Sequence, residues 1–125
     1  MRVLMACIAA CITAAGVTAP AWAAGAPVER IVVPYAGGGV TDLCGRVLAE
    51  RLQADQASPV LVDNRPGGGA AIGTAYVAKS TADGRTVLLG SVGTATNPAM
   101  IKSMPYDPRD IVPVAQVATS PLVLY

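Results

Sequence analysis

The fold is decided by residues 30–46, Arg30-Ile-Val-Val-Pro-Tyr-Ala-Gly-Gly-Gly-Val-Thr-Asp-Leu-Cys-Gly-Arg46. A short β-branched run ends at a proline, three glycines follow, and apolar residues then recur at helical spacing. We therefore expect a strand over residues 30–34, a glycine loop, and a helix whose cap is Thr41 or Asp42. The apolar residues expected along one face of this helix are Leu43, Val47, Leu48 and Leu52, with Arg46, Glu50 and Arg51 on its solvated side.

A second unit of strand, glycine loop and helix follows. We expect a strand over residues 60–63, a loop with three more glycines, and a helix over residues 70–80. Asp83-Gly84 predicts a turn into a third strand over residues 86–90. The side chains that share one side of the second helix are Ile72, Tyr76 and Lys79. Because strands that alternate with such helices favour right-handed crossovers, the expected fold class is α/β, with a mostly parallel sheet flanked by helices.

The pattern weakens after the third strand. We expect a hydroxyl-rich loop over residues 91–97, a short helix over residues 98–103 and a proline-bounded turn over residues 105–108. Strands are expected over residues 111–118 and 121–125. The last of these is apolar and ends without a polar tail, which is typical of an interrupted domain.

Residues 1–23 have the composition of a secretory signal peptide. Arg2 is followed by an apolar run over residues 3–15, and Ala21-Trp-Ala23 is the small-residue pattern that precedes a cleavage site. A membrane anchor is the alternative, but glycine, threonine and proline between residues 16 and 20 interrupt the run before the roughly 20 apolar residues of a span. We therefore expect export to the periplasm, cleavage after Ala23, and a mature chain that does not itself span the membrane.

Composition excludes several classes of function. The chain has nine basic residues, eight acidic residues and no histidine. Removal of Arg2 with the signal peptide leaves a net charge of zero, so no basic surface indicates nucleic acid. Without histidine there is no Ser-His or Cys-His pair, and Cys44 with scattered aspartates makes no metal site. We expect a protein that is not an enzyme and has no metal and no cofactor.

The two glycine loops predict a site for an anion. In an open parallel sheet, ligands bind at the carboxyl ends of the strands, where residues 35–42, 67–72 and 91–97 are expected to lie. Unpaired N–H groups at a helix start favour a carboxylate or phosphate, and glycine lets it approach the backbone. Two alternatives stay open. Each loop is also explained by a tight turn between strand and helix, and a nucleotide is a second ligand class, although neither loop has a complete nucleotide-binding fingerprint.

Several motifs in order resemble one family, the periplasmic solute receptors of tripartite tricarboxylate transporters, also called Bug-type receptors. They are Pro34-Tyr-Ala-Gly-Gly-Gly-Val-Thr-Asp42 with Arg46, Val62-Asp-Asn-Arg-Pro-Gly67 through Ile72-Gly73, Ala82-Asp-Gly84, Asn97-Pro98, Met104-Pro-Tyr-Asp-Pro108 and Pro113-Val114. The resemblance implies a two-lobed receptor that captures a small carboxylate and presents it to membrane permease subunits. Family members are more than twice as long, so residues 24–125 are expected to be an incomplete first lobe of a periplasmic binding protein, without the second lobe.

The resemblance also implies which residues bind the ligand, largely through backbone groups. Carried onto this chain, they are Tyr35, Gly38, Gly39, Thr41 and Asp42 in the first loop, Gly69, Ala70 and Ala71 in the second, and Ser91, Thr94 and Asn97 in the third segment. The expected ligand is a di- or tricarboxylate, an amino acid or an aromatic acid. The alternatives are a truncated exported fragment without transport activity and a nucleotide-binding α/β module.

Overall fold

The computed structural model describes residues 27–119. The expected signal peptide and the expected last strand, residues 121–125, lie outside this range. Within it, no helix combines the length and the hydrophobicity that crossing a membrane requires.

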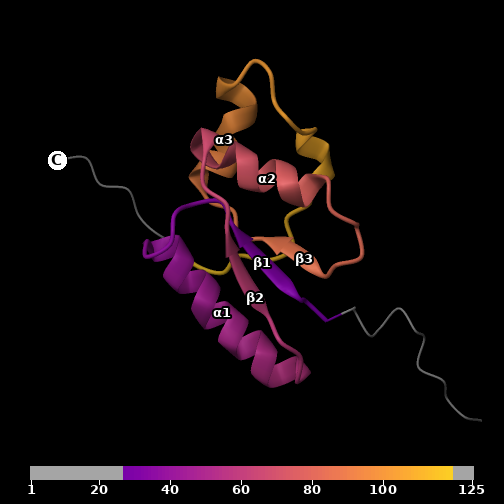
Figure 1. The fold of residues 1–125 in the computed structure, drawn as a ribbon. Helices are drawn as coiled ribbons and strands as arrows, with labels where there is room; N and C mark the ends of the chain where they lie inside the picture. Colours follow the sequence, from indigo (N-terminus) through magenta and orange to yellow (C-terminus); the bar gives the residue numbers. More distant parts are fainter. Residues whose placement is uncertain (1–26, 120–125) are drawn as a thin grey trace, which may run out of the picture.

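Three strands alternate with helices, as expected (Figure 1). The elements in chain order are β1 (Arg30–Val33), α1 (Val40–Gln56), β2 (Leu61–Asn64), the short 3-10 helix η2 (Gly68–Ala70), α2 (Ala71–Ala78), β3 (Thr86–Leu88), α3 (Val92–Met100) and the 3-10 helix η3 (Pro108–Asp110). The prediction of three strand regions and of the first two helices is confirmed.

The strands form a parallel sheet with β1 in the centre and the order β2-β1-β3. The first crossover leads from β1 to β2, and the second leads from β2 back past β1 to β3. Because the two crossovers run in opposite directions along the sheet, right-handed connections place α1 and α2 on opposite faces. Figure 1 shows α1 on one side of the strands and α2 on the other, with α3 beyond α2. The α/β class with a mostly parallel sheet is therefore confirmed.

The core is built around β1, whose residues Ile31, Val32 and Val33 are fully buried. Successive side chains point to opposite faces of a strand, and Ile31 and Val33 pack with Ala49 of α1. A Cβ added to Gly45 would lie 3.0 Å from Cγ2 of Val33. Helix α1 therefore lies close to the sheet.

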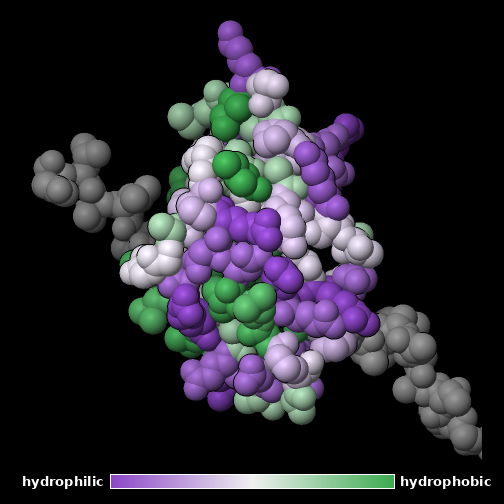
Figure 2. Space-filling view, viewed as in Figure 1, coloured by the Kyte–Doolittle hydropathy of each residue, from purple (hydrophilic) through white to green (hydrophobic). Residues whose placement is uncertain are grey.

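The face that α1 buries differs from the one expected. Leu43 is 64% exposed and Val47 is 55% exposed, whereas the buried residues are Asp42, Gly45 and Ala49. Of the predicted apolar face, Leu43 and Val47 are therefore exposed, because small residues let the helix approach the strands and the larger ones then lie to the side. Figure 2 shows apolar patches among polar ones in the region of α1.

Helix α2 also buries a face of small residues. Its buried residues are Ala71, Gly73, Thr74 and Ala75. A Cβ added to Gly73 would lie 2.8 Å from Cβ of Pro34, so α2 contacts the end of β1 directly. The side of α2 that carries Ile72, Tyr76 and Lys79 faces away from the sheet, and Ile72 is 57% exposed. The ring centroid of Tyr76 lies 3.5 Å from Cζ of Arg65.

Two expectations for the C-terminal part were wrong. Residues 92–100 form α3, in place of a loop over residues 91–97 and a helix over residues 98–103. Residues 111–118 pair with no strand in the described part of the chain, and Val112 and Val114 are exposed. A run rich in valine makes a strand only where a neighbouring strand can pair with its backbone groups.

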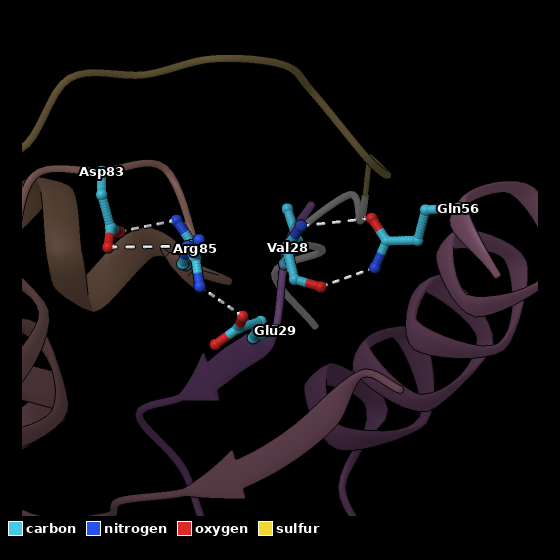
Figure 3. Close-up of polar contacts among 5 residues, drawn as sticks. All are labelled: Val28, Glu29, Gln56, Asp83 and Arg85. Atoms are coloured by element: carbon cyan, nitrogen blue, oxygen red, sulfur yellow. Dashed lines mark hydrogen bonds and ion pairs between the residues drawn. The ribbon is translucent and has the colours of Figure 1, made fainter. Parts of the chain in front are cut away.

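The amino-terminal edge of the sheet is closed by polar contacts (Figure 3). The side-chain amide of Gln56, at the end of α1, accepts a hydrogen bond from the Val28 N–H and donates one to the Val28 carbonyl, at 3.1 Å and 2.6 Å. Nearby, Arg85 pairs with Glu29 at 2.8 Å. The glycine loops lie at the opposite edge.

Candidate functional site

The central position of β1 decides where a ligand can bind. The chain leaves β1 toward α1 on one face, and neighbouring β3 receives its connection from α2 on the other face. In open α/β sheets a ligand binds in the crevice outside the carboxyl ends of two neighbouring strands whose connections lie on opposite faces. Here these strands are β1 and β3. Tyr35, after β1, and Ser91, after β3, meet here: their hydroxyl oxygens lie 2.5 Å apart.

The second glycine loop reaches the same place by way of α3. The Asn97 side-chain amide, in a residue only 6% exposed, donates a hydrogen bond of 2.7 Å to the Gly69 carbonyl. A Cβ added to Gly93 would lie 2.7 Å from that carbonyl oxygen and 2.8 Å from the Tyr35 hydroxyl. All three predicted segments therefore converge, and Gly93 is the point at which they touch.

The first loop is held by a buried carboxylate. The N-cap of α1 is Gly39, which has no side chain to cap the helix, so the prediction that Thr41 or Asp42 is the cap was wrong. Asp42 lies in the first turn, where it reaches back and accepts a hydrogen bond of 2.8 Å from the Gly38 N–H. Arg46 and Asn64 donate to the same carboxylate at 3.0 Å and 3.1 Å.

These contacts control the ionisation of Asp42. The hydrogen bond from the Gly38 backbone, followed by that from Arg46, lowers the pKa of this carboxyl to about 2. The carboxylate is therefore charged at neutral pH although it is only 3% exposed. Its position at a helix start also favours the charged form.

The second loop contains a backbone conformation that is unusual for its residue. Ala70 has φ of 85° and is buried. A residue with a Cβ adopts this left-handed region at a cost of roughly 1–2 kcal/mol. The Thr74 hydroxyl donates a hydrogen bond of 2.8 Å to the Ala70 carbonyl and holds the strained residue at the start of α2.

The arrangement leaves backbone donors available for an anion. The first N–H groups of an α-helix have no partner within the helix. In residues 27–119, the N–H groups of Gly39, Val40 and Thr41 have no acceptor, while that of Gly38 is taken by Asp42. The 17-residue helix behind them adds the positive end of its dipole. These groups can bind a carboxylate or a phosphate.

The predicted site residues differ in the contacts that they make. Tyr35 contacts Ser91 and Asn97 contacts Gly69, while Gly39 and Thr41 lie at the start of α1. The side chain of Asp42 and the N–H groups of Gly38 and Ala71 are occupied by internal hydrogen bonds. The Thr94 hydroxyl is buried without a hydrogen-bond partner in the described part of the chain.

Two residues of the site were missed in the sequence. Asn64 was read only as part of the loop after β2, and Gly93 as part of a loop after β3. A polar residue that ends a strand directly before a glycine loop was the available signal for Asn64. Gly93 offered no signal, because its importance comes from contacts across the fold.

The acidic and thiol side chains of the described residues form no metal cluster. No group of three His, Cys, Asp or Glu side chains within residues 27–119 is placed to bind a metal ion. An open groove of about 720 Å³ lies near the other edge of the sheet and is lined by paired charges such as Arg30, Glu29 and Arg85. The groove therefore lies away from the glycine loops.

Comparisons with known proteins agree with this geometry. Residues 44–125 match the family described as tripartite tricarboxylate transporter family receptor. Protein BugT of Bordetella pertussis is 44% identical over 129 residues, which cover 99% of this chain and 40% of BugT. This chain therefore spans about two fifths of the length of that relative.

Solved structures give the same result. Rpa4515 of R. palustris, described with adipate, has 36% identity and a TM-score of 0.61, over 66% of this chain and 28% of that one. MatC from Rhodopseudomonas palustris, described with bound malate, has 27% identity and a TM-score of 0.57, over 65% of this chain and 28% of that one. The chain belongs to the receptor family of the tripartite tricarboxylate transporters.

Proposed function

We propose that this chain supplies the first-lobe half of a periplasmic receptor for a small carboxylate, which a tripartite tricarboxylate transporter then takes up through its membrane permease. The observation that carries the proposal is the group of unpaired N–H donors at Gly39, Val40 and Thr41, in the loop segment that begins with Tyr35, whose hydroxyl contacts Ser91. A signal peptide over residues 1–23, cleaved after Ala23, would deliver the chain to the periplasm.

The chemistry of these donors favours a carboxylate. A carboxylate accepts short hydrogen bonds from N–H groups at a helix start and is stabilised there by the dipole. The relatives described with adipate and malate bind dicarboxylates, so we propose a dicarboxylate as the first ligand class to test. One carboxylate would lie at Gly39, Val40 and Thr41, and the other would extend toward the start of α3 at Ser91.

The half-site predicts weak binding by the chain alone. Preformed ligand sites enclose most of the ligand surface, whereas the loops here offer donors from one side only. We therefore propose that high affinity needs a second lobe. The 125-residue chain alone should bind with a Kd in the millimolar range, which is a binding free energy of about −4 kcal/mol.

Amide NMR spectra of the isotope-labelled chain, purified after export, test the proposal. Titration with adipate should shift the amide signals of Gly39, Val40, Thr41 and residues 91–93, and leave those of β1 unchanged. Adipamide, which has the same length and no charge, is the control and should shift none of them. Equal shifts with both compounds, or shifts confined to the groove at Arg30 and Arg85, would contradict a carboxylate site at the glycine loops.

Two further arms separate the alternatives. Inorganic phosphate and adenosine monophosphate test the nucleotide-binding module, which predicts stronger shifts with the nucleotide than with adipate. A truncated fragment without transport activity predicts a folded spectrum that no carboxylate changes.

A further inference from the structure

We propose that Asn64, acting with Asp42, holds the first glycine loop in the conformation that presents its N–H groups to the ligand. Both are positioning residues, because their side chains contact the loop and each other. This inference rests on the proposed function and adds to it a residue outside the glycine loops.

Asn64 joins the two ends of the loop. It is the last residue of β2 and lies opposite Val33, the last residue of β1. Its side-chain nitrogen donates to the Tyr35 carbonyl at 3.2 Å and to Oδ1 of Asp42 at 3.1 Å. Since both partners only accept hydrogen bonds, the orientation of the amide group is determined by chemistry. One side chain therefore contacts the chain just before and just after the three glycines.

Asp42 uses its other oxygen to fix the middle of the loop. Oδ2 accepts from the Gly38 N–H at 2.8 Å, and Gly38 has φ of 88°, a conformation that glycine adopts without strain. With the Gly38 N–H taken, the next three N–H groups belong to Gly39, Val40 and Thr41, which have no acceptor in residues 27–119. The contact thus decides which donors remain for a ligand.

A buried carboxylate beside an anion site would repel the ligand unless its charge were offset. Arg46 lies one turn along α1 and donates to Oδ2 of Asp42 at 3.0 Å, with 59% of its side chain exposed. The guanidinium therefore offsets the charge of the carboxylate and remains largely exposed to solvent. Asn64 supports the same carboxylate without adding a charge, which an aspartate at that position could not do.

Substitution Asn64→Leu tests the inference, because it removes both donors while keeping a side chain of similar size. Gln56→Leu is the matched control: Gln56 also ties a backbone segment to α1 through two amide hydrogen bonds, at the opposite edge of the sheet. We expect amide hydrogen exchange at Gly38 to become about tenfold faster in Asn64→Leu than in Gln56→Leu, and the Kd for adipate to rise about tenfold.

Each outcome decides the inference. Unchanged exchange at residues 37–41 in Asn64→Leu would overturn it, and so would faster exchange with unaltered adipate affinity, since Asn64 would then be merely structural. If the unsubstituted chain shows no adipate binding, the proposed function fails, while the exchange measurement still reports whether Asn64 orders the loop.

A second measurement needs no substitution. A scalar coupling across the hydrogen bond between the Gly38 amide and the Asp42 carboxyl carbon is detectable by NMR in the unaltered chain. We expect this coupling to be present. Its absence, in a spectrum that resolves other amide couplings of α1, would overturn the inference even if Asn64→Leu failed to fold.

Discussion

The hydroxyl oxygens of Tyr35 and Ser91 lie 2.5 Å apart and join the segments that follow β1 and β3. This contact spans the reversal of the sheet, where the fold brings residues 56 positions apart into hydrogen-bonding distance. It predicts that Tyr35→Phe lowers the free energy of unfolding by about 0.5–1 kcal/mol and weakens adipate binding. Urea unfolding and an NMR titration measure the two effects.

Tyr106→Phe is the matched control. The Tyr106 hydroxyl is buried and makes no hydrogen bond with the described part of the chain. Loss of that hydroxyl should leave stability unchanged or raise it slightly, because an unsatisfied buried polar group is costly. If both substitutions had the same effect, the contact between Tyr35 and Ser91 would have no special role.

Gly93→Ala should destabilise the fold although alanine favours helices. Intrinsic propensity alone predicts a gain of about 1 kcal/mol within α3. The added Cβ would, however, lie 2.7 Å from the Gly69 carbonyl oxygen, so we expect a net loss of about 1–3 kcal/mol by urea unfolding. A more stable Gly93→Ala variant would show that the loops are not in contact at α3.

Acid should destabilise the protein through Asp42. Its pKa is lowered from 3.8 to about 2 in the folded state, so the stabilisation is present above the unfolded pKa and is lost as the pH falls through the folded pKa. Between about pH 4 and about pH 2, the unfolding free energy of Asp42→Asn should therefore fall less steeply than that of the unsubstituted chain. Asp107, whose pKa is also lowered to about 2, contributes equally to both proteins and cancels in the comparison. Parallel curves would contradict the contacts assigned to Asp42.

Export should remove residues 1–23. The intact mass of the chain recovered from the periplasm of an expression host should correspond to a product that starts at Ala24. A mass that retains Met1, in a chain bound to the inner membrane, would instead identify the apolar run as an anchor.

The sequence predicts the three strands of the sheet and the first two helices because local patterns and glycine loops determine them. It does not predict which face α1 buries. Leu43 and Val47 satisfy the same helical periodicity as Gly45 and Ala49, and only the close approach of α1 to Val33 selects the small residues. Periodicity identifies a helix, whereas packing against the sheet decides its orientation.

The sequence also predicts only part of the candidate site. The first loop and its unpaired N–H groups follow from a strand, three glycines and a helix start. The link between Asn97 and Gly69 requires α3, which residues of low helix propensity conceal in the sequence and which tertiary contacts stabilise. The role of Asn64 depends on its register opposite Val33, and pairing register cannot be read from one strand alone.

The most direct test of the central claim compares Gly39→Ala with Gly39→Pro. Gly39 has φ of −84°, and an added Cβ would approach nothing closer than 3.9 Å, so alanine should fold normally and keep the N–H donor. Proline has no N–H group but accommodates a φ near this value. Both variants should have the circular dichroism of the unsubstituted chain. The account predicts that adipate affinity in the NMR titration is retained in Gly39→Ala and lost in Gly39→Pro; equal affinity of the two folded variants would contradict it.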